Sequence, residues 1–272
     1  MPELPEVETI RRGLAPLLVG RTLRETRVLD GRLRWPVPVR ELAVATDGRV
    51  IREIGRRGKY LLLACGAGHL LIHLGMSGRL TWLAGPEPLR PHQHVVWHLE
   101  GGAEMRLTDP RRFGAVLWAA GEWRDHPLLA GLGPEPLERD FSGDYCLEKA
   151  RGRRVAVKSW LMDGRMVAGV GNIYAAEALF RAGIHPGRTV GELSALHWQA
   201  LVEAVQTVLR EAIAQGGTTL RDFRQADGEP GYFVQSLQVY GRAHAPCPVC
   251  GEPIRQCRIG QRSTCFCPRC QG

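Results

Sequence analysis

The first apolar residues of the chain recur with the period of a helix. Val7, Ile10, Leu14 and Leu17 are separated by three or four positions, which predicts one buried face of an amphipathic helix. Pro5 suits the first turn of such a helix, and the acidic side chains that follow it complement the positive end of the helix dipole. This helix gives no explanation for the residues that come before Pro5.

From about Gly20 to Ala120 the apolar residues form short runs of strand length instead. The runs are YLLLAC, HLLIHLGMSGRLTWL, HVVWHLEGGAEMRLTD and FGAVLWA, and Gly, Pro and Asp separate them. The two glycines within HLEGGAEM predict a hairpin between two strands of alternating polarity. Several such strands in succession predict a β-sandwich or a barrel.

Beyond these strands the pattern becomes that of helices. The stretch 126–138 is rich in Gly and Pro, which predicts a linker. A long helix is then predicted between Ser194, a candidate N-cap, and Gly216, a candidate C-terminal stop. Its apolar positions hold near-helical spacing and are Trp198, Leu201, Val205, Val208 and Ile213.

Composition narrows the class of protein. The 272 residues suffice for about two domains, and they carry a formal net charge of +8 with a pI of about 9.3. Such a balance is typical of proteins that bind nucleic acid, although a solvated basic surface would give the same count. No apolar run approaches the ~18–20 residues of a membrane-spanning helix, and no signal-peptide pattern opens the chain. We therefore expect a soluble intracellular protein.

Six of the eight cysteines lie in the last 26 residues. The four cysteines of two CxxC pairs, which are Cys247, Cys250, Cys267 and Cys270, can surround one tetrahedral zinc ion, and four filled positions define a structural site. A redox pair is the less favoured alternative. Cys257 and Cys265 are left over, either as small apolar filler or as ligands out of register. Arg262 would lie near the tip of the hairpin between the pairs, as a phosphate ligand or as a solvated charge.

The run VAGVGNIYAAE predicts a Gly-rich turn that leads into a helix at about Asn172. Backbone N–H groups at a helix start bind anions, and the side chain of Asn172, the only asparagine of the chain, can add a donor. A simple helix cap is the alternative. The run lacks the GxGxxG pattern and a preceding strand, which excludes a dinucleotide site.

Two further motifs, HLGMSGR and TDPRRFG, place Met76, Arg111 and Phe113 in turns at strand ends. Met and Phe are usually core residues. Beside Gly and Arg in turns they are also candidates for apolar wedges, which open a DNA duplex by insertion between bases.

Taken in order, the motifs PELPEVE, GRRGKYLL, HLGMSGR, TDPRRFG, KSWLMD, GVGNIYAAEALF, GGTTLRDF, DGEPGYF, QVYGR and the paired cysteines resemble bacterial formamidopyrimidine-DNA glycosylases. The resemblance covers essentially the whole chain. It implies an α+β multidomain fold, with a catalytic two-layer β-sandwich over residues 1–130. A linker and a helix-two-turn-helix DNA-binding domain over 131–232 would follow, and then a zinc finger over 233–272.

The resemblance also implies a function. The chain would be a monomeric, cytoplasmic and nucleoid-associated DNA glycosylase and AP lyase of base-excision repair. It would excise oxidised purines, chiefly 8-oxoguanine and formamidopyrimidines, from double-stranded DNA held between its two halves. One structural Zn²⁺ would be bound by the four paired cysteines.

Site residues follow from the same resemblance. Pro2 would be the nucleophile, Glu3 the general acid and Glu6 a supporting carboxylate, while Lys59 would contact phosphate beside the lesion. Met76, Arg111 and Phe113 would fill the gap left by the flipped base. Backbone phosphates would be held by Lys158, Asn172 and Arg262, and His92 and Tyr240 would be further DNA contacts. Residues 218–240 would close over the damaged base.

The amine chemistry accounts for the opening residues. Once Met1 is removed, Pro2 carries a free secondary amine, and an α-amino group has a pKa of about 8, against about 10.4 for lysine. Such an amine is a nucleophile near neutral pH. Glu3 and Glu6 would supply the acid, and which of them is protonated stays open. Lys59, next to the apolar run YLLL, is the competing nucleophile.

Two departures and two alternatives accompany this interpretation. Cys257 and Cys265 lie outside the family pattern, and Glu229 stands where a lysine is expected, which bears on loop mobility or base preference. One alternative is an endonuclease VIII-type glycosylase for oxidised pyrimidines. The other is a non-catalytic zinc-containing DNA-binding protein, which would form no borohydride-trappable adduct.

Overall fold

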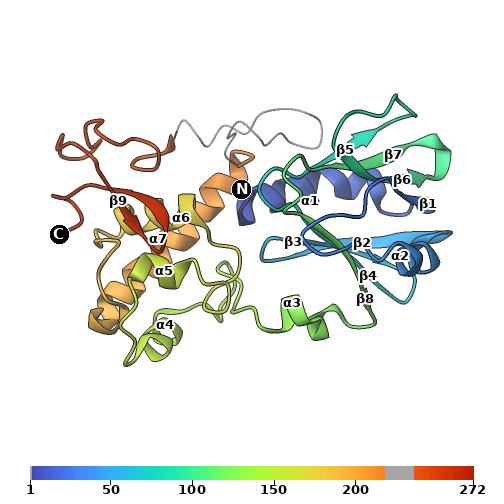
Figure 1. The fold of residues 1–272 in the computed structure, drawn as a ribbon. Coiled ribbons are helices and arrows are strands. Elements are labelled where there is room, and N and C mark those ends of the chain that lie inside the picture. The colour runs from blue at the N-terminus through green and yellow to red at the C-terminus, as the bar shows by residue number, and fades with distance from the viewer. Residues whose placement is uncertain (1, 218–235) are drawn as a thin grey trace. The chain divides into compact units, whose positions relative to one another are not determined.

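The computed structural model describes residues 2–217 and 236–272 of the chain (Figure 1). These residues form two compact units, one of residues 2–130 with 216–217 and the other of residues 131–215 with 236–272. Among them no helix is long and apolar enough to cross a membrane.

The first unit opens with the predicted helix, α1, which spans Leu4–Leu18. A proline occupies its first turn, and Glu3 is the N-cap. Val7, Ile10 and Leu14 are buried in the core as expected. The prediction for Leu17 was wrong, because the helix turns Leu18 rather than Leu17 into the core.

Eight antiparallel strands follow, in the hydrogen-bonded order β5-β7-β6-β1-β2-β3-β4-β8. The sheet folds at β1, which pairs along most of its length with β6 but meets β2 only at Thr22 and Leu23. Two layers result, and apolar side chains of both form one core. The predicted sandwich is confirmed. The strands are β1 Thr22–Val28, β2 Arg49–Arg57, β3 Tyr60–Cys65, β4 Gly68–His73, β5 Arg79–Leu83, β6 Gln93–Leu99, β7 Glu104–Thr108 and β8 Ala115–Ala120.

Three details of this unit concern the sequence predictions. The hairpin between β6 and β7 turns where expected, at Gly101 and Gly102, which have φ values of 83° and 82°. Helix α2, Val39–Thr46, was not predicted. It buries only Leu42 and Thr46, so its apolar periodicity is too weak to detect. The expected linker 126–138 contains the short helix α3, Pro127–Ala130.

The second unit contains helices α4 Gly143–Ala150, α5 Val157–Leu161, α6 Asn172–Arg181 and α7 Ala195–Ala214. α7 is the long predicted helix, and the Ser194 hydroxyl caps it by accepting a hydrogen bond from the backbone N–H of His197. Four of its predicted apolar positions are buried, but Ile213 is only half-buried, because Ala212 faces the core in its place. α6 starts at Asn172 after a Gly-rich turn, as predicted.

The chain ends in a β-hairpin of β9, Arg255–Ile259, and β10, Arg262–Phe266. Gly260 and Gln261 form the turn with φ values of 54° and 62°, as a two-residue hairpin loop requires. The hairpin and the cysteines pack on α6 through a cluster that contains Ala176, Phe180 and Ile254.

Candidate active site and metal centre

The start of α1 holds three of the predicted catalytic residues in a buried position. Pro2, Glu3 and Glu6 all lie in the buried class, and the two glutamates are each 2% exposed. The backbone N–H of Glu3 donates to Oε2 of Glu6 at 2.8 Å, and the Glu3 side chain accepts the N–H of Glu6 in return. This reciprocal capping box fixes both carboxylates at the start of α1, directly after Pro2.

Gly217 approaches the carboxylate of Glu6. It has a φ of +79°, and a Cβ at this position would lie 3.0 Å from Oε1 of Glu6. A side chain here would therefore crowd Glu6 and strain the backbone. Residues 218–235, which include most of the predicted lesion loop and Glu229, lie outside the described residues.

Lys59 lies in the two-residue turn between β2 and β3, after Gly58 with its φ of +54°. The turn places Lys59 beside the end of β4. Burial, followed by the positive charges of Lys59 and Arg34, lowers the pKa of His73 to about 4. His73 is therefore neutral at neutral pH, and its Nδ1 accepts the N–H of Gly75 at 3.0 Å.

The three wedge candidates come from two turns that the structure brings together. The hydroxyl of Ser77, one residue after Met76, donates to the Asp109 carboxylate at 2.7 Å and accepts the backbone N–H of Arg111 at 3.2 Å. Phe113 is 43% exposed, and the Arg111 guanidinium lies 5.2 Å from its ring centre. Phe113 is therefore an exposed residue and not part of the core.

Asp109 organises these turns, and sequence reasoning did not single it out. It is fully buried, and its second carboxylate oxygen accepts the N–H of Gly114 at 2.8 Å. The backbone N–H of Asp109 donates to the carbonyl of His92 at 3.0 Å, so Asp109 also holds His92 beside these turns. His92 is exposed and has a φ of 67°. The Asp-Pro pair inside TDPRRFG was the available signal, since Asp commonly closes a turn.

In the second unit, the structure gathers the three predicted phosphate ligands around Ser263. The carbonyl of Ser263 accepts from Nζ of Lys158 at 3.1 Å and from Nδ2 of Asn172 at 3.2 Å. Lys158 is fully buried and also donates to Oγ1 of Thr264 at 2.6 Å. Arg262, which precedes Ser263, is exposed at the start of β10. Residues about 100 positions apart thus form one polar cluster.

Tyr240 is held by a buried acid that sequence reasoning also missed. Glu177 of α6 is fully buried, and its carboxylate accepts the backbone N–H groups of Gln238, Val239 and Tyr240 at 2.9, 3.0 and 2.8 Å. A charged residue within the apolar run NIYAAEALF was the signal that could have revealed it, because a buried charge needs dedicated partners.

The four paired cysteines form a candidate metal centre. Their Sγ atoms all lie within 4.8 Å of one another, and two of the separations are 3.9 Å, between Cys247 and Cys270, and 3.5 Å, between Cys250 and Cys267. Zinc–sulfur bonds of about 2.3 Å in a tetrahedron place sulfurs about 3.8 Å apart, so these cysteines fit the ion. In the described part of the chain they are the one group of side chains with this geometry.

The two leftover cysteines lie outside this centre. Cys265 is buried in the cluster between the hairpin and α6, which agrees with its interpretation as apolar filler. Cys257 is half-buried and pairs across the hairpin with Thr264. Because Cys265 pairs with Gln256 instead, the two cysteines occupy opposite faces of the hairpin.

Comparisons with known proteins give the same architecture. Residues 1–116 match the formamidopyrimidine-DNA glycosylase N-terminal domain, and residues 132–224 match the formamidopyrimidine-DNA glycosylase H2TH domain. Residues 246–272 match the zinc finger found in FPG and IleRS. A catalytic sandwich, a helix-two-turn-helix domain and a four-cysteine finger in this order define a DNA glycosylase of base-excision repair.

The similarity to individual proteins extends over the full chain. Formamidopyrimidine-DNA glycosylases of Alkalilimnicola ehrlichii and Magnetococcus marinus are 56% and 54% identical, with coverage of 99% or more of both chains in each pair. The crystal structure of MutM (FPG) from Thermus thermophilus superposes with a TM-score of 0.88 at 42% identity, over 100% of this chain and 99% of that one. A Lactococcus lactis FPG mutant in complex with Fapy-dG-containing DNA gives 0.92 at 31% identity, over 99% of both chains. The chain belongs to the formamidopyrimidine-DNA glycosylase family.

Proposed function

We propose that this chain excises oxidised purines, 8-oxoguanine and formamidopyrimidines, from double-stranded DNA and then nicks the strand as an AP lyase. The observation that carries the proposal is the start of α1, where two buried carboxylates are locked beside Pro2. Structures of the Lactococcus lactis relative contain Fapy-dG, abasic-site and oxidised-pyrimidine DNA, and one of MutM contains carbocyclic 8-oxo-G.

The chemistry begins with the amine of Pro2 after removal of Met1. Its lone pair attacks C1′ of the flipped nucleotide, and the N-glycosidic bond breaks as the base leaves with the bonding electrons. The Pro2 nitrogen loses its proton after the attack, which balances the proton that the departing base gains, and its lone pair is then free to expel O4′. Glu3 donates a proton to O4′ as the sugar ring opens, which leaves an iminium between the Pro2 nitrogen and C1′. Glu6, through its hydrogen bond to the Glu3 N–H, keeps Glu3 next to this centre.

The iminium makes strand cleavage possible. Its positive charge acidifies the C2′–H bond, so loss of that proton expels the 3′ phosphate in a β-elimination. A second proton loss expels the 5′ phosphate in a δ-elimination. Lys59 contacts the phosphate beside the lesion and neutralises charge there. Met76, Arg111 and Phe113 fill the space that the flipped nucleotide leaves in the duplex.

DNA is held mainly through its backbone. Lys158, Asn172 and Arg262 would hold phosphates from the cluster around Ser263, and His92 and Tyr240 would add further contacts. The four cysteines would hold one Zn²⁺, which would supply no chemistry but would keep the finger hairpin folded.

The remaining assignments concern the organisation of the chain. We assign residues 1–130 to the catalytic domain, 131–232 to the linker and helix-two-turn-helix domain, and 233–272 to the finger. The net charge of +8 suits a cytoplasmic, nucleoid-associated enzyme that works as a monomer.

The proposal is tested with duplexes that carry one defined lesion. We expect faster cleavage at 8-oxoguanine than at an oxidised pyrimidine, with a one-nucleoside gap flanked by phosphates, the product of β,δ-elimination. Faster cleavage at the pyrimidine would favour the endonuclease VIII-type alternative. Binding without cleavage of either lesion would favour the non-catalytic alternative.

A further inference from the structure

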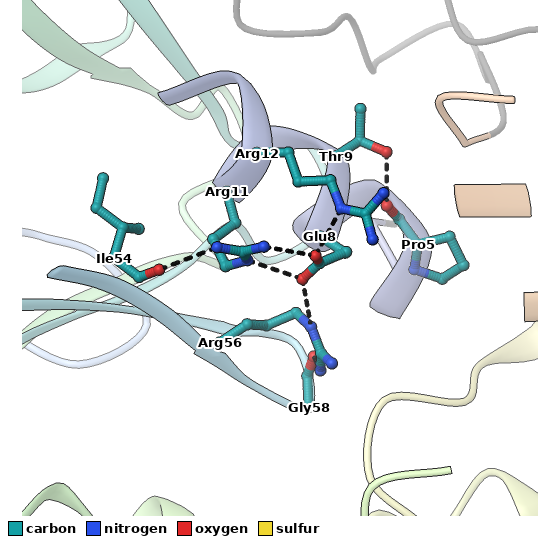
Figure 2. A network of polar contacts seen from close by, with 8 residues as sticks. All are labelled: Pro5, Glu8, Thr9, Arg11, Arg12, Ile54, Arg56 and Gly58. Carbon is teal, nitrogen blue, oxygen red and sulfur yellow. Dashed lines mark hydrogen bonds and ion pairs between the residues drawn. The ribbon is translucent and has the colours of Figure 1, made fainter. Parts of the chain in front are cut away.

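Glu8 lies one helical turn after Pro5 and is the centre of a polar network in the first unit (Figure 2). Its carboxylate accepts two bonds from Arg11, at 3.0 and 2.8 Å, and one from Nε of Arg12 at 2.8 Å. Nε of Arg56, on β2, adds a fourth at 3.2 Å. The family chemistry described above makes no use of Glu8, although its side chain is only 11% exposed.

Two of these arginines also donate hydrogen bonds to backbone carbonyls of the β2–β3 hairpin, and so connect Glu8 to it. Nη1 of Arg11 donates to the carbonyl of Ile54 at 3.3 Å. Nη1 of Arg56 donates to the carbonyl of Gly58 at 3.0 Å, and Gly58 directly precedes Lys59 (Figure 2). A planar guanidinium is suited to bridge a carboxylate and a carbonyl in this way, because its donors are fixed in one plane.

The network therefore joins two segments about 50 residues apart. One segment is α1, whose capped start carries Pro2 and Glu3. The other is the turn that carries Lys59. Burial opposes the charge of Glu8, but hydrogen bonds from Arg11 and Arg12 and the charge of Arg56 lower its pKa to about 2. The carboxylate thus keeps its charge throughout the neutral range.

We propose that Glu8 is a positioning residue for catalysis, which holds the Gly58–Lys59 turn in register with the start of α1 through Arg56. Lys59 and Pro2 must act on neighbouring atoms of one nucleotide, and a displacement of about 1 Å can cost on the order of 100-fold in rate. This inference rests on the roles proposed above for Pro2 and Lys59.

The first test is Glu8→Gln, which keeps the shape of the side chain but turns one acceptor oxygen into a donor that faces the arginines. The single-turnover rate on an 8-oxoguanine duplex, with enzyme in excess, should fall about tenfold or more. The dissociation constant for the same duplex should change much less than the rate, since only the phosphate contact of Lys59 is displaced and those of Lys158, Asn172 and Arg262 are untouched.

Two variants are controls. Arg12→Gln removes a guanidinium that is 60% exposed and that contacts Glu8 from the same helix, α1. Because this contact does not link α1 to the β2–β3 turn, the variant should keep the wild-type rate. Leu14→Ala removes a fully buried core side chain of the same helix. It should lower the melting temperature at least as much as Glu8→Gln, yet keep the wild-type rate at a temperature where it is folded.

Arg56→Lys separates positioning from simple ion pairing. An ammonium group can pair with Glu8, but it lacks the planar fork that also reaches the Gly58 carbonyl. The variant should therefore melt close to wild type and still react about tenfold more slowly. The double variant with Glu8→Gln should be no slower than the slower single variant, because both changes break the same link.

The outcomes distinguish this inference from the proposed function. Wild-type rates for Glu8→Gln and Arg56→Lys, with the wild-type enzyme trapped at Pro2, would overturn the positioning role alone. A slow Leu14→Ala variant would also overturn it, because loss of stability would then explain the slow rates. Absence of a Pro2 adduct in the wild-type enzyme would instead contradict the function on which the inference rests.

Discussion

Replacing Glu177 with glutamine is expected to loosen the finger from helix α6. One oxygen of the wild-type carboxylate accepts the N–H groups of Val239 and Tyr240, and the other accepts that of Gln238. In Glu177→Gln one oxygen remains, and the new amide nitrogen faces a donor. The variant loses one hydrogen bond outright and weakens two others from charge-assisted to neutral.

The magnitude follows from these three bonds. A hydrogen bond to a charged group contributes about 1.5–3 kcal/mol, and a neutral one about half of that. The gross loss is therefore about 3–6 kcal/mol. Relief of the cost of burying the charge offsets part of it, so we expect a net destabilisation of about 2–4 kcal/mol.

The assay is the urea concentration at which the finger releases its metal, followed with a colorimetric chelator. Glu211→Gln is the matched control, because it makes the same substitution in an ion pair with Arg181, at 2.6 Å, whose glutamate side chain is 42% exposed. Such surface pairs contribute less than about 1 kcal/mol. Equal urea midpoints for the two variants would refute the role of Glu177.

Three further predictions concern metal binding, phosphate binding and the stability of the protein at acidic pH. Cys250→Ser should lower metal content and DNA affinity but leave the first unit folded by circular dichroism, and one full equivalent of zinc in the variant would contradict the four-cysteine site. Arg262→Ala should weaken binding to all duplexes alike, and it should reduce the steepness of the plot of log binding constant against log salt concentration by about one unit. An altered lesion preference at an unchanged slope would exclude a phosphate contact. Arginine contacts lower the pKa of Glu8 from 4.5 to about 2 against the effect of burial, so its stabilisation is complete above about pH 5 and is lost as the pH falls toward 2. The difference in unfolding free energy between wild type and Glu8→Gln should shrink by about 3 kcal/mol over that range, and parallel pH curves would show that the arginines do not hold the charge.

Local patterns predicted much of this fold, because their physical cause lies within a few residues. The spacing of two CxxC pairs is enough to suggest a tetrahedral metal centre, and the structure brings those four cysteines together. Ser194 marked the start of α7 because an N-cap acts on the next turn of its own helix. The hairpin at Gly101 and Gly102 was predictable for the same reason.

The residues that organise the candidate site were harder to find. Glu8 was interpreted only through the dipole of its own helix, whereas its partner Arg56 is 48 positions away. Glu177 accepts hydrogen bonds from backbone groups more than 60 positions away, and Lys158 donates one to Thr264, which is 106 positions away. Such partners are set by tertiary packing, so neither periodicity nor spacing reveals them. Sequence patterns identified the residues that would contact DNA, but not those that hold them in place.

The central claim is that the terminal amine of Pro2 forms the covalent bond to DNA, and borohydride trapping tests it most directly. Borohydride reduces the iminium to a stable amine, and mass spectrometry of the digested complex locates the adduct. On an 8-oxoguanine duplex we predict one adduct, on the N-terminal peptide at Pro2, and none from a form that retains Met1, because an amide nitrogen has no basic lone pair. An adduct at Lys59, or full activity in the form that retains Met1, would contradict the account.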